Sequence, residues 1–128
     1  MAIPPVLRAL LTAHGPSGYE TAPAAAFREA ASAYAEITTD VMGSVWARVP
    51  GTADGPTLAI VGHIDEIGLI VTHIDDNGFL RFIGVGGWDP VILVGQRVEV
   101  TTRDGLLQGV VGKKPIHLLK EDERKRAA

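Results

Sequence analysis

Residues 57–68 read TLAIVGHIDEIG, and this stretch decides the fold expected for the whole chain. Its first five residues, 57–61, are mostly apolar and are followed by a glycine, which predicts a fully buried β-strand. A histidine, an aspartate and a glutamate come directly after that strand. In α/β sheets, ligands and catalytic groups gather where strands end. The stretch therefore predicts an α/β fold with a candidate functional site at the end of this strand.

His63 and Asp65 have the spacing expected of a metal ligand and the carboxylate that orients it. Residues two apart in an extended chain point to the same side, so Asp65 can reach the ring of His63. A carboxylate that accepts the second ring proton is the usual partner of a metal-bound histidine. The same pair also fits a structural hydrogen bond at a strand end, and the motif alone leaves both interpretations open. Glu66 faces the other way, which suits a structural role or a substrate contact.

The composition is that of a globular protein of one ordinary domain. The 128 residues are 46% hydrophobic and 21% charged, and the net charge of −3 argues against a nucleic-acid partner. Because cysteine is absent, disulfides and thiolate metal sites are excluded, and any metal would be held by nitrogen and oxygen. No apolar run approaches the ~20 residues of a membrane span, and residues 1–5 lack the features of a signal peptide. We therefore expect a cytoplasmic protein without a membrane partner.

Two helices are predicted near the start of the chain. Pro4-Pro5 suits a first helical turn, and residues 7–14 repeat apolar positions at helical spacing until Gly15-Pro16 ends the helix. The next four residues, Ser17-Gly18-Tyr19-Glu20, form a capping-box pattern. This pattern predicts the start of a second helix, with its apolar stripe over residues 27–34.

The rest of the chain reads mainly as strands. Turn residues at 75–78 and 103–105 predict two hairpins. A glycine-rich break at residues 84–87 lacks the lysine of a P-loop and precedes no helix pattern, so it predicts a turn, with Trp88 anchoring packing or an interface. Residues 120–126 form a charge run that we expect to be solvated. The predicted strands span residues 36–40, 45–49, 57–61, 67–74, 79–83, 97–101 and 106–111.

The other three histidines are weaker candidates for a metal. His73 and Asp75 repeat the same spacing, but they precede a turn in which Asp75 has an ordinary role. His14 completes a helical stripe, and His117 has no acidic partner at a suggestive spacing. The sequence thus offers one convincing ligand, His63, whereas a zinc site needs three or four protein ligands.

Seven short motifs, in order and spread over nearly the whole chain, resemble a known family. They are GPSGYE at 15–20, DVMGS at 40–44, GHIDEIG at 62–68, GFLRF at 78–82, GGWD at 86–89, GQRV at 95–98 and GKKPIHLL at 112–119. Together they resemble the opening of the tetrahedral aminopeptidases, metallopeptidase family forty-two, which are similar to glutamyl aminopeptidase.

This resemblance implies an architecture, a cofactor and a function. Residues 1–69 would begin an α/β zinc-aminopeptidase catalytic domain, with two helices and a mixed sheet. Residues 70–119 would be part of an inserted, small β-barrel-like domain of the dimerisation type, and 120–128 a charged tail. Members of the family are cytoplasmic exopeptidases that remove N-terminal residues from peptides, carry two divalent metals per subunit, zinc or cobalt, and assemble from dimers into dodecamers. By the resemblance, His63 is the first metal ligand and Asp65 the catalytic carboxylate beside it.

The family's other metal ligands and its general base have no match in this sequence. The chain resembles roughly the first third of such an enzyme, so we expect the isolated 128 residues to bind metal weakly or not at all and not to catalyse. One alternative is a non-catalytic assembly or binding module derived from the family. Another is an independent small β/α binding protein with coincidental motifs, which seven ordered motifs make improbable.

Overall fold

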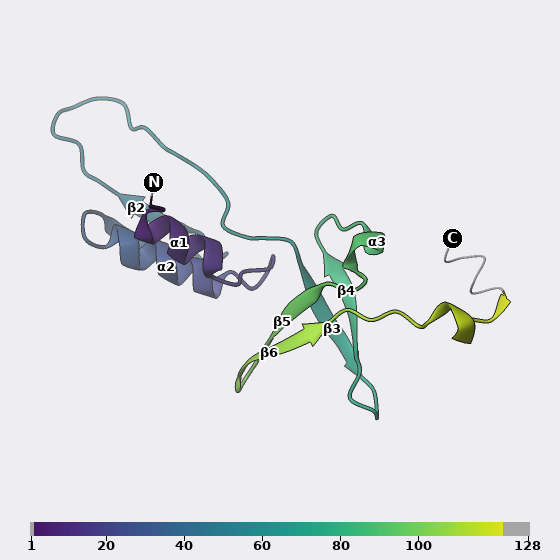
Figure 1. Ribbon diagram of the computed structural model, residues 1–128. Helices are drawn as coiled ribbons and strands as arrows, with labels where there is room; N and C mark the ends of the chain where they lie inside the picture. The colour runs from purple at the N-terminus through teal and green to yellow at the C-terminus, as the bar shows by residue number, and fades with distance from the viewer. Residues whose placement is uncertain (1, 122–128) are drawn as a thin grey trace. The chain divides into compact units, whose positions relative to one another are not determined.

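The computed structural model describes residues 2–121 (Figure 1). Their contacts divide them into two compact units. The first unit ends at Trp88, and the second begins at Asp89. The boundary at residues 69 and 70 implied by the resemblance is a different division of the chain, and it stays a prediction. The first unit contains α1 (Pro5–Thr12), α2 (Thr21–Ala31), β1 (Glu36–Thr39), β2 (Val45–Arg48), β3 (Gly68–Ile74) and β4 (Leu80–Val85); the second contains α3 (Pro90–Leu93), β5 (Arg97–Thr102), β6 (Gly105–Val110) and a 3₁₀ helix (Ile116–Leu118).

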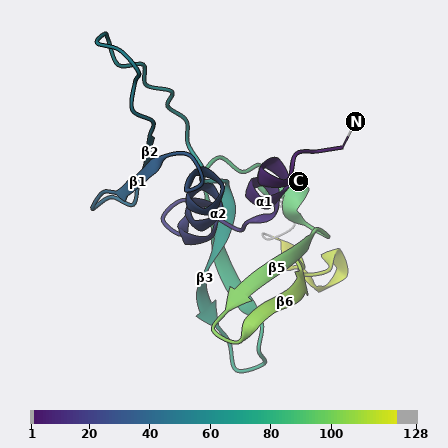
Figure 2. The same ribbon diagram turned by 90° about the vertical axis from the view of Figure 1, so that its left-hand side faces the viewer.

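The two predicted helices are present, and they pack against each other in the first unit (Figures 1 and 2). α1 begins at Pro5, whose missing N–H group costs nothing in a first helical turn. α2 begins later than the capping-box pattern predicted, at Thr21. The predicted capping box is wrong, because the Ser17 hydroxyl donates to Asp65 instead and Glu20, the actual N-cap, makes no side-chain cap bond. Within residues 2–121, no helix combines the length and the apolar character needed to cross a membrane.

The strands form three separate two-stranded antiparallel sheets, β1 with β2, β3 with β4 and β5 with β6. Six of the predicted strands are confirmed, with ends that differ by at most two residues. The expected mixed sheet is not formed by the described part of the chain. Its parallel pairing is confined to an isolated bridge between Pro16 and Glu66. The α/β class is therefore confirmed, but each sheet is a hairpin.

The predicted buried strand at residues 57–61 is wrong. These residues lie outside every strand, and Leu58, Ile60 and Val61 are 85%, 93% and 85% exposed. Figures 1 and 2 show this part of the link from β2 to β3 as an extended trace without an arrow. A strand exists only where a neighbour takes up its backbone hydrogen bonds, and no other segment among residues 2–121 pairs with this one. The apolar composition of residues 57–61 suits a buried strand, but residues 2–121 supply no strand that pairs with it.

The glycine-rich break at residues 84–87 is followed by a short helix, which the sequence did not predict. Asp89 caps α3 by accepting a hydrogen bond from the backbone N–H of Val91 at 3.0 Å. Pro90 then provides a first residue with a suitable φ angle. A helix of four residues is too short to produce a periodic pattern, so its cap was the only available signal. From residue 122 onward, the predicted charge run lies outside the described residues.

The hydrophobic core of the described residues is small. Its buried apolar side chains are Pro23, Ala24 and Ala31 on α2, together with Leu93 and Val111 in the second unit. Two of these five are alanines, which remove little area from water and therefore contribute little hydrophobic stabilisation. Many larger apolar side chains stay exposed, including Phe79 on the β3–β4 turn. Exposure on this scale is typical of surfaces that other polypeptide covers.

Local hydrogen bonds and the backbone conformation of one glycine determine the β3–β4 turn. Asp75 accepts hydrogen bonds from the N–H groups of Asn77 and Phe79, and Gly78 follows with a φ of 82°. A side chain at Gly78 would meet open space but would be held in the left-handed region, at a cost of about 1–2 kcal/mol. We therefore expect Gly78→Ala to accelerate amide hydrogen exchange in β3 and β4 by about 5–30-fold.

The matched control for this variant is Gly55→Ala, because Gly55 also has open space around it and has an ordinary φ. It should leave the exchange rates of β3 and β4 unchanged. Equal exchange in the two variants would contradict the role assigned to the left-handed conformation of Gly78.

Candidate metal centre

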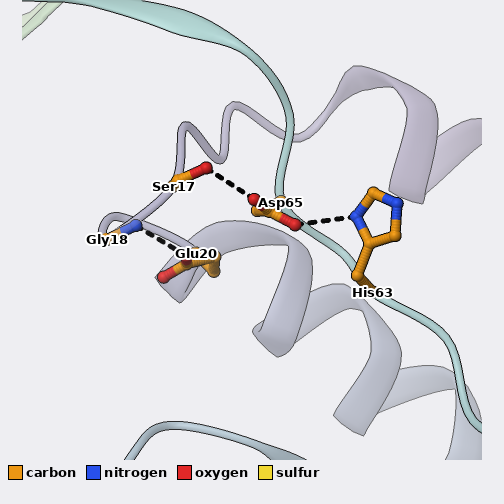
Figure 3. Close-up of polar contacts among 5 residues, drawn as sticks. All are labelled: Ser17, Gly18, Glu20, His63 and Asp65. Atoms are coloured by element: carbon orange, nitrogen blue, oxygen red, sulfur yellow. Dashed lines mark hydrogen bonds and ion pairs between the residues drawn. The ribbon is translucent and has the colours of Figure 1, made fainter. Parts of the chain in front are cut away.

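The structure brings His63, Asp65 and Ser17 together (Figure 3). His63 Nδ1 lies 2.7 Å from Oδ1 of Asp65, and the Ser17 hydroxyl donates to Oδ2 of the same carboxylate at 2.5 Å. Each carboxylate oxygen therefore has its own partner, on opposite sides of the group. The sequence predicted the contact between His63 and Asp65, and the structure adds Ser17.

Backbone pairing around Glu66 holds these three side chains in place. The Glu66 N–H donates to the carbonyl of Gly15 at 2.9 Å, and the Ser17 N–H donates to the carbonyl of Glu66 at 3.3 Å. The Glu66 carboxylate also accepts from the N–H of Gly15 at 3.1 Å. Glu66 thus fixes the loop that carries Ser17, which agrees with the structural role expected for it.

The last residue of the GHIDEIG motif, Gly68, lies close against Pro16. A Cβ atom added to Gly68 would lie 2.8 Å from Cβ of Pro16, so only glycine fits there. The Trp88 indole N–H donates to the carbonyl of Gly68 at 2.8 Å, and its ring lies against Gly84. The packing role predicted for Trp88 is confirmed by these contacts.

The pKa of Asp65 is lowered from its ordinary value, first because Ser17 donates a hydrogen bond to it and then because His63 adds a hydrogen bond and a charge interaction. Asp65 is therefore a carboxylate at neutral pH and can only accept hydrogen bonds. The proton of the bond to His63 must accordingly lie on Nδ1. In the neutral form of His63 this leaves Nε2 with a free lone pair, on a side chain that is 86% exposed.

The chemistry of these groups fits a divalent metal, although their number does not complete a site. A neutral imidazole nitrogen whose other ring N–H donates to a carboxylate is a favourable zinc ligand. Within residues 2–121, however, no three histidine or acidic side chains gather closely enough to hold a metal ion. His73 lies on β3 opposite Arg81, and Asp75 serves the following turn. The described residues therefore offer one candidate ligand, His63, with the Asp65 carboxylate against its ring.

Ser17 is the site residue that the sequence did not reveal. It lies 48 residues from Asp65 along the chain, and its position before a helix suggested a capping role instead. The only sequence signal available was that GPSG and GHIDEIG both belong to the set of motifs that resembled the family. No spacing rule joins two segments so far apart.

Comparison with known proteins establishes the family. The family model for M42 glutamyl aminopeptidase matches residues 43–128. The chain belongs to this family of metallopeptidases, as its motifs predicted.

The similar proteins are aminopeptidases that are much longer than this chain. The lysyl aminopeptidase of Pyrococcus furiosus is 41% identical over 86 residues, which are 67% of this chain and 24% of that protein. The crystal structure of a TET aminopeptidase from a marine sediment archaeon of the Thaumarchaeota has 41% identity and a TM-score of 0.84, covering 94% of this chain and 34% of that one. The TET1 peptidase of Pyrococcus horikoshii, which can assemble into a tetrahedron or a large octahedral shell, has 34% identity and a TM-score of 0.73, covering 91% and 34%. This chain therefore spans about a quarter to a third of these relatives.

The lowered pKa of Asp65 gives the candidate site a defined response to acid. A carboxylate whose pKa is depressed in the folded state stabilises that state above the ordinary value of about 3.9, and this contribution is lost as the pH falls through the folded pKa. We expect the carboxyl carbon of Asp65, followed by NMR, to titrate below the ordinary value. In Ser17→Ala its midpoint should rise, because the first cause of the shift is removed.

The control for this titration is Ser44→Ala. Ser44 lies in the β1–β2 turn, where both its N–H and its side chain form hydrogen bonds with Asp40, and it is not among the causes of the Asp65 shift. An Asp65 midpoint that is the same in Ser17→Ala and in Ser44→Ala would contradict the assigned cause.

Proposed function

We propose that this chain contributes the first metal ligand, and the carboxylate that orients it, to an aminopeptidase that releases N-terminal residues from peptides. Membership of the M42 family supports the activity, and the His63–Asp65 contact is the observation that carries the assignment of the site. The metals would be zinc or cobalt, two per subunit in the complete enzyme. The proposed location is the cytoplasm.

Each residue of the pair has a separate task in this proposal. His63 would hold one metal through Nε2, and Asp65 would keep the imidazole ring in the orientation and protonation state that make Nε2 available. When bound, the metals supply Lewis acidity that polarises the peptide carbonyl and activates water. The remaining ligands and the general base would come from polypeptide that corresponds to the other two thirds of the relatives.

The isolated 128-residue chain should consequently not be an aminopeptidase. One histidine cannot hold two metals, and the described residues supply no set of three ligands. We expect calorimetric titration with Zn²⁺ or Co²⁺ to show weak binding at most, and aminoacyl chromogenic substrates to stay intact. Tight binding of two metals with hydrolysis of such a substrate would contradict this expectation.

The proposed activity can be tested in a chimera. The third of the Thaumarchaeota TET aminopeptidase that matches this chain would be replaced by this chain, since the two share 41% identity over 94% of it. We expect the chimera to hydrolyse aminoacyl substrates, and His63→Ala to lower kcat/KM by about 100-fold or more, since even indirect partners of a metal contribute 10–100-fold.

His73→Ala is the matched control in the chimera, because His73 has the same spacing to an aspartate but lies on β3. It should retain the parental activity. A chimera that assembles and binds metal but is inactive, or one in which the two variants lose activity equally, would contradict the proposal. Size-exclusion chromatography and metal analysis would establish assembly and metal content.

A role in assembly is a second candidate function, favoured by exposed apolar side chains on β6. Leu106, Leu107 and Val110 are all exposed on this strand, which belongs to a two-stranded sheet that no other strand among residues 2–121 joins. Free strand edges with apolar side chains readily pair with other chains. In this proposal, residues 70–119 are part of a small barrel-like domain through which subunits form dimers and then dodecamers. Light scattering should show association that increases with concentration, and a monomer at every concentration would contradict the assembly role.

A further inference from the structure

We propose that Ser17 is a positioning residue of the metal centre, because its hydroxyl holds the Asp65 carboxylate in the orientation that keeps the proton of His63 on Nδ1 and leaves Nε2 to bind metal. The metal-binding part of this proposal rests on the proposed function. The control of the His63 tautomer by Ser17 does not.

The Asp65 carboxylate is divided between two partners. Oδ2 accepts from the Ser17 hydroxyl, and Oδ1 is left for His63. Without Ser17, the carboxylate would have one side-chain partner, and that partner is the highly exposed ring of His63. Water would then compete for both carboxylate oxygens, and the group would rotate more freely. The Ser17 hydroxyl therefore restricts rotation of the Asp65 carboxylate, which the hydrogen bond to His63 alone would not restrict.

Ser17 is itself held in place by hydrogen bonds of its loop. Its N–H donates to the carbonyl of Glu66, and the N–H of Tyr19 donates to the carbonyl of Pro16 at 2.7 Å. Gly18 follows with a φ of 89°, and its N–H donates to the Glu20 carboxylate at 2.6 Å (Figure 3). The hydroxyl thus projects from a turn fixed on both sides, which suits a group that must hold another side chain still.

The chemistry of imidazole connects the position of the Asp65 carboxylate with metal binding by His63. A neutral histidine carries its proton on one ring nitrogen, and the hydrogen bond made by one nitrogen decides which nitrogen is free for metal. If the proton moves to Nε2, that nitrogen can no longer bind a metal. A fixed carboxylate at Nδ1 opposes this change. Ser17 would thereby act on the metal ligand through Asp65, without touching the metal or the substrate.

The test is the tautomer of His63 in the 128-residue chain without metal. The nitrogen chemical shifts of the ring would be measured by NMR at about pH 8, above the ordinary histidine pKa of about 6.5. We expect the proton of His63 on Nδ1 in the parent protein and a shift of the population towards Nε2 in Ser17→Ala. His73 serves as an internal reference whose signals should not change.

Ser17→Thr distinguishes loss of the hydroxyl from damage to the loop. Threonine keeps the hydroxyl, so its His63 signals should resemble those of the parent protein. An unchanged His63 tautomer in Ser17→Ala would overturn the proposal. So would a threonine variant with the backbone signals of the intact loop but with the same tautomer shift as the alanine variant.

Metal affinity provides a second measurement, in the chimera. Ser17→Ala should weaken the binding of Zn²⁺ by about 10–100-fold, as removal of such indirect partners does elsewhere. A chimera that assembles and binds metal but is inactive would refute the proposed function. If Ser17→Ala still shifts the His63 tautomer in the 128-residue chain, the positioning role would stand. If the chimera is active but Ser17→Ala changes neither its metal affinity nor the tautomer of His63, only the positioning role would be refuted.

Discussion

The pairing between Gly15 and Glu66 is the interaction on which the candidate site depends. These residues are 51 positions apart, yet three hydrogen bonds join their neighbourhood, two between backbone groups and one from the Gly15 N–H to the Glu66 carboxylate. This pairing holds the loop that carries Ser17 beside the segment that carries Asp65, so that the two side chains can form their hydrogen bond. The close approach of Pro16 and Gly68 reinforces it, because a side chain at Gly68 would push the two segments apart. The site is therefore built by a small, well-bonded junction and owes little to a large hydrophobic core.

The features that could be predicted from the sequence are those decided by residues close together along the chain. Two local predictions are confirmed. Pro5 begins α1. The turn at residues 75–78 closes the β3–β4 hairpin, and Asp75 accepts hydrogen bonds there from the N–H groups two and four positions ahead. The contact between His63 and Asp65 was equally local, because spacing alone brings their side chains to one side.

Predictions failed where the deciding partner lies far away in the sequence or where residues 2–121 supply no partner. Ser17 satisfied a helix-capping pattern but bonds to Asp65 instead, and no local rule favours one partner over the other. Residues 57–61 have the composition of a buried strand, but burial and pairing require neighbours that residues 2–121 do not supply. The expected mixed sheet failed for the same reason. A sequence pattern thus indicates which secondary structure a segment can adopt. Whether the segment adopts it depends on the neighbouring segments with which it can pair.

The central claim is that His63 is presented as a metal ligand through Nε2 while Asp65 holds Nδ1. The most direct test is to titrate the ¹⁵N-labelled 128-residue chain with Zn²⁺ and follow both ring nitrogens of His63 and His73. The claim predicts that Nε2 of His63 responds first and that its Nδ1 keeps the signature of the bond to Asp65. A response at Nδ1 of His63, or an equal response of His73, would contradict it.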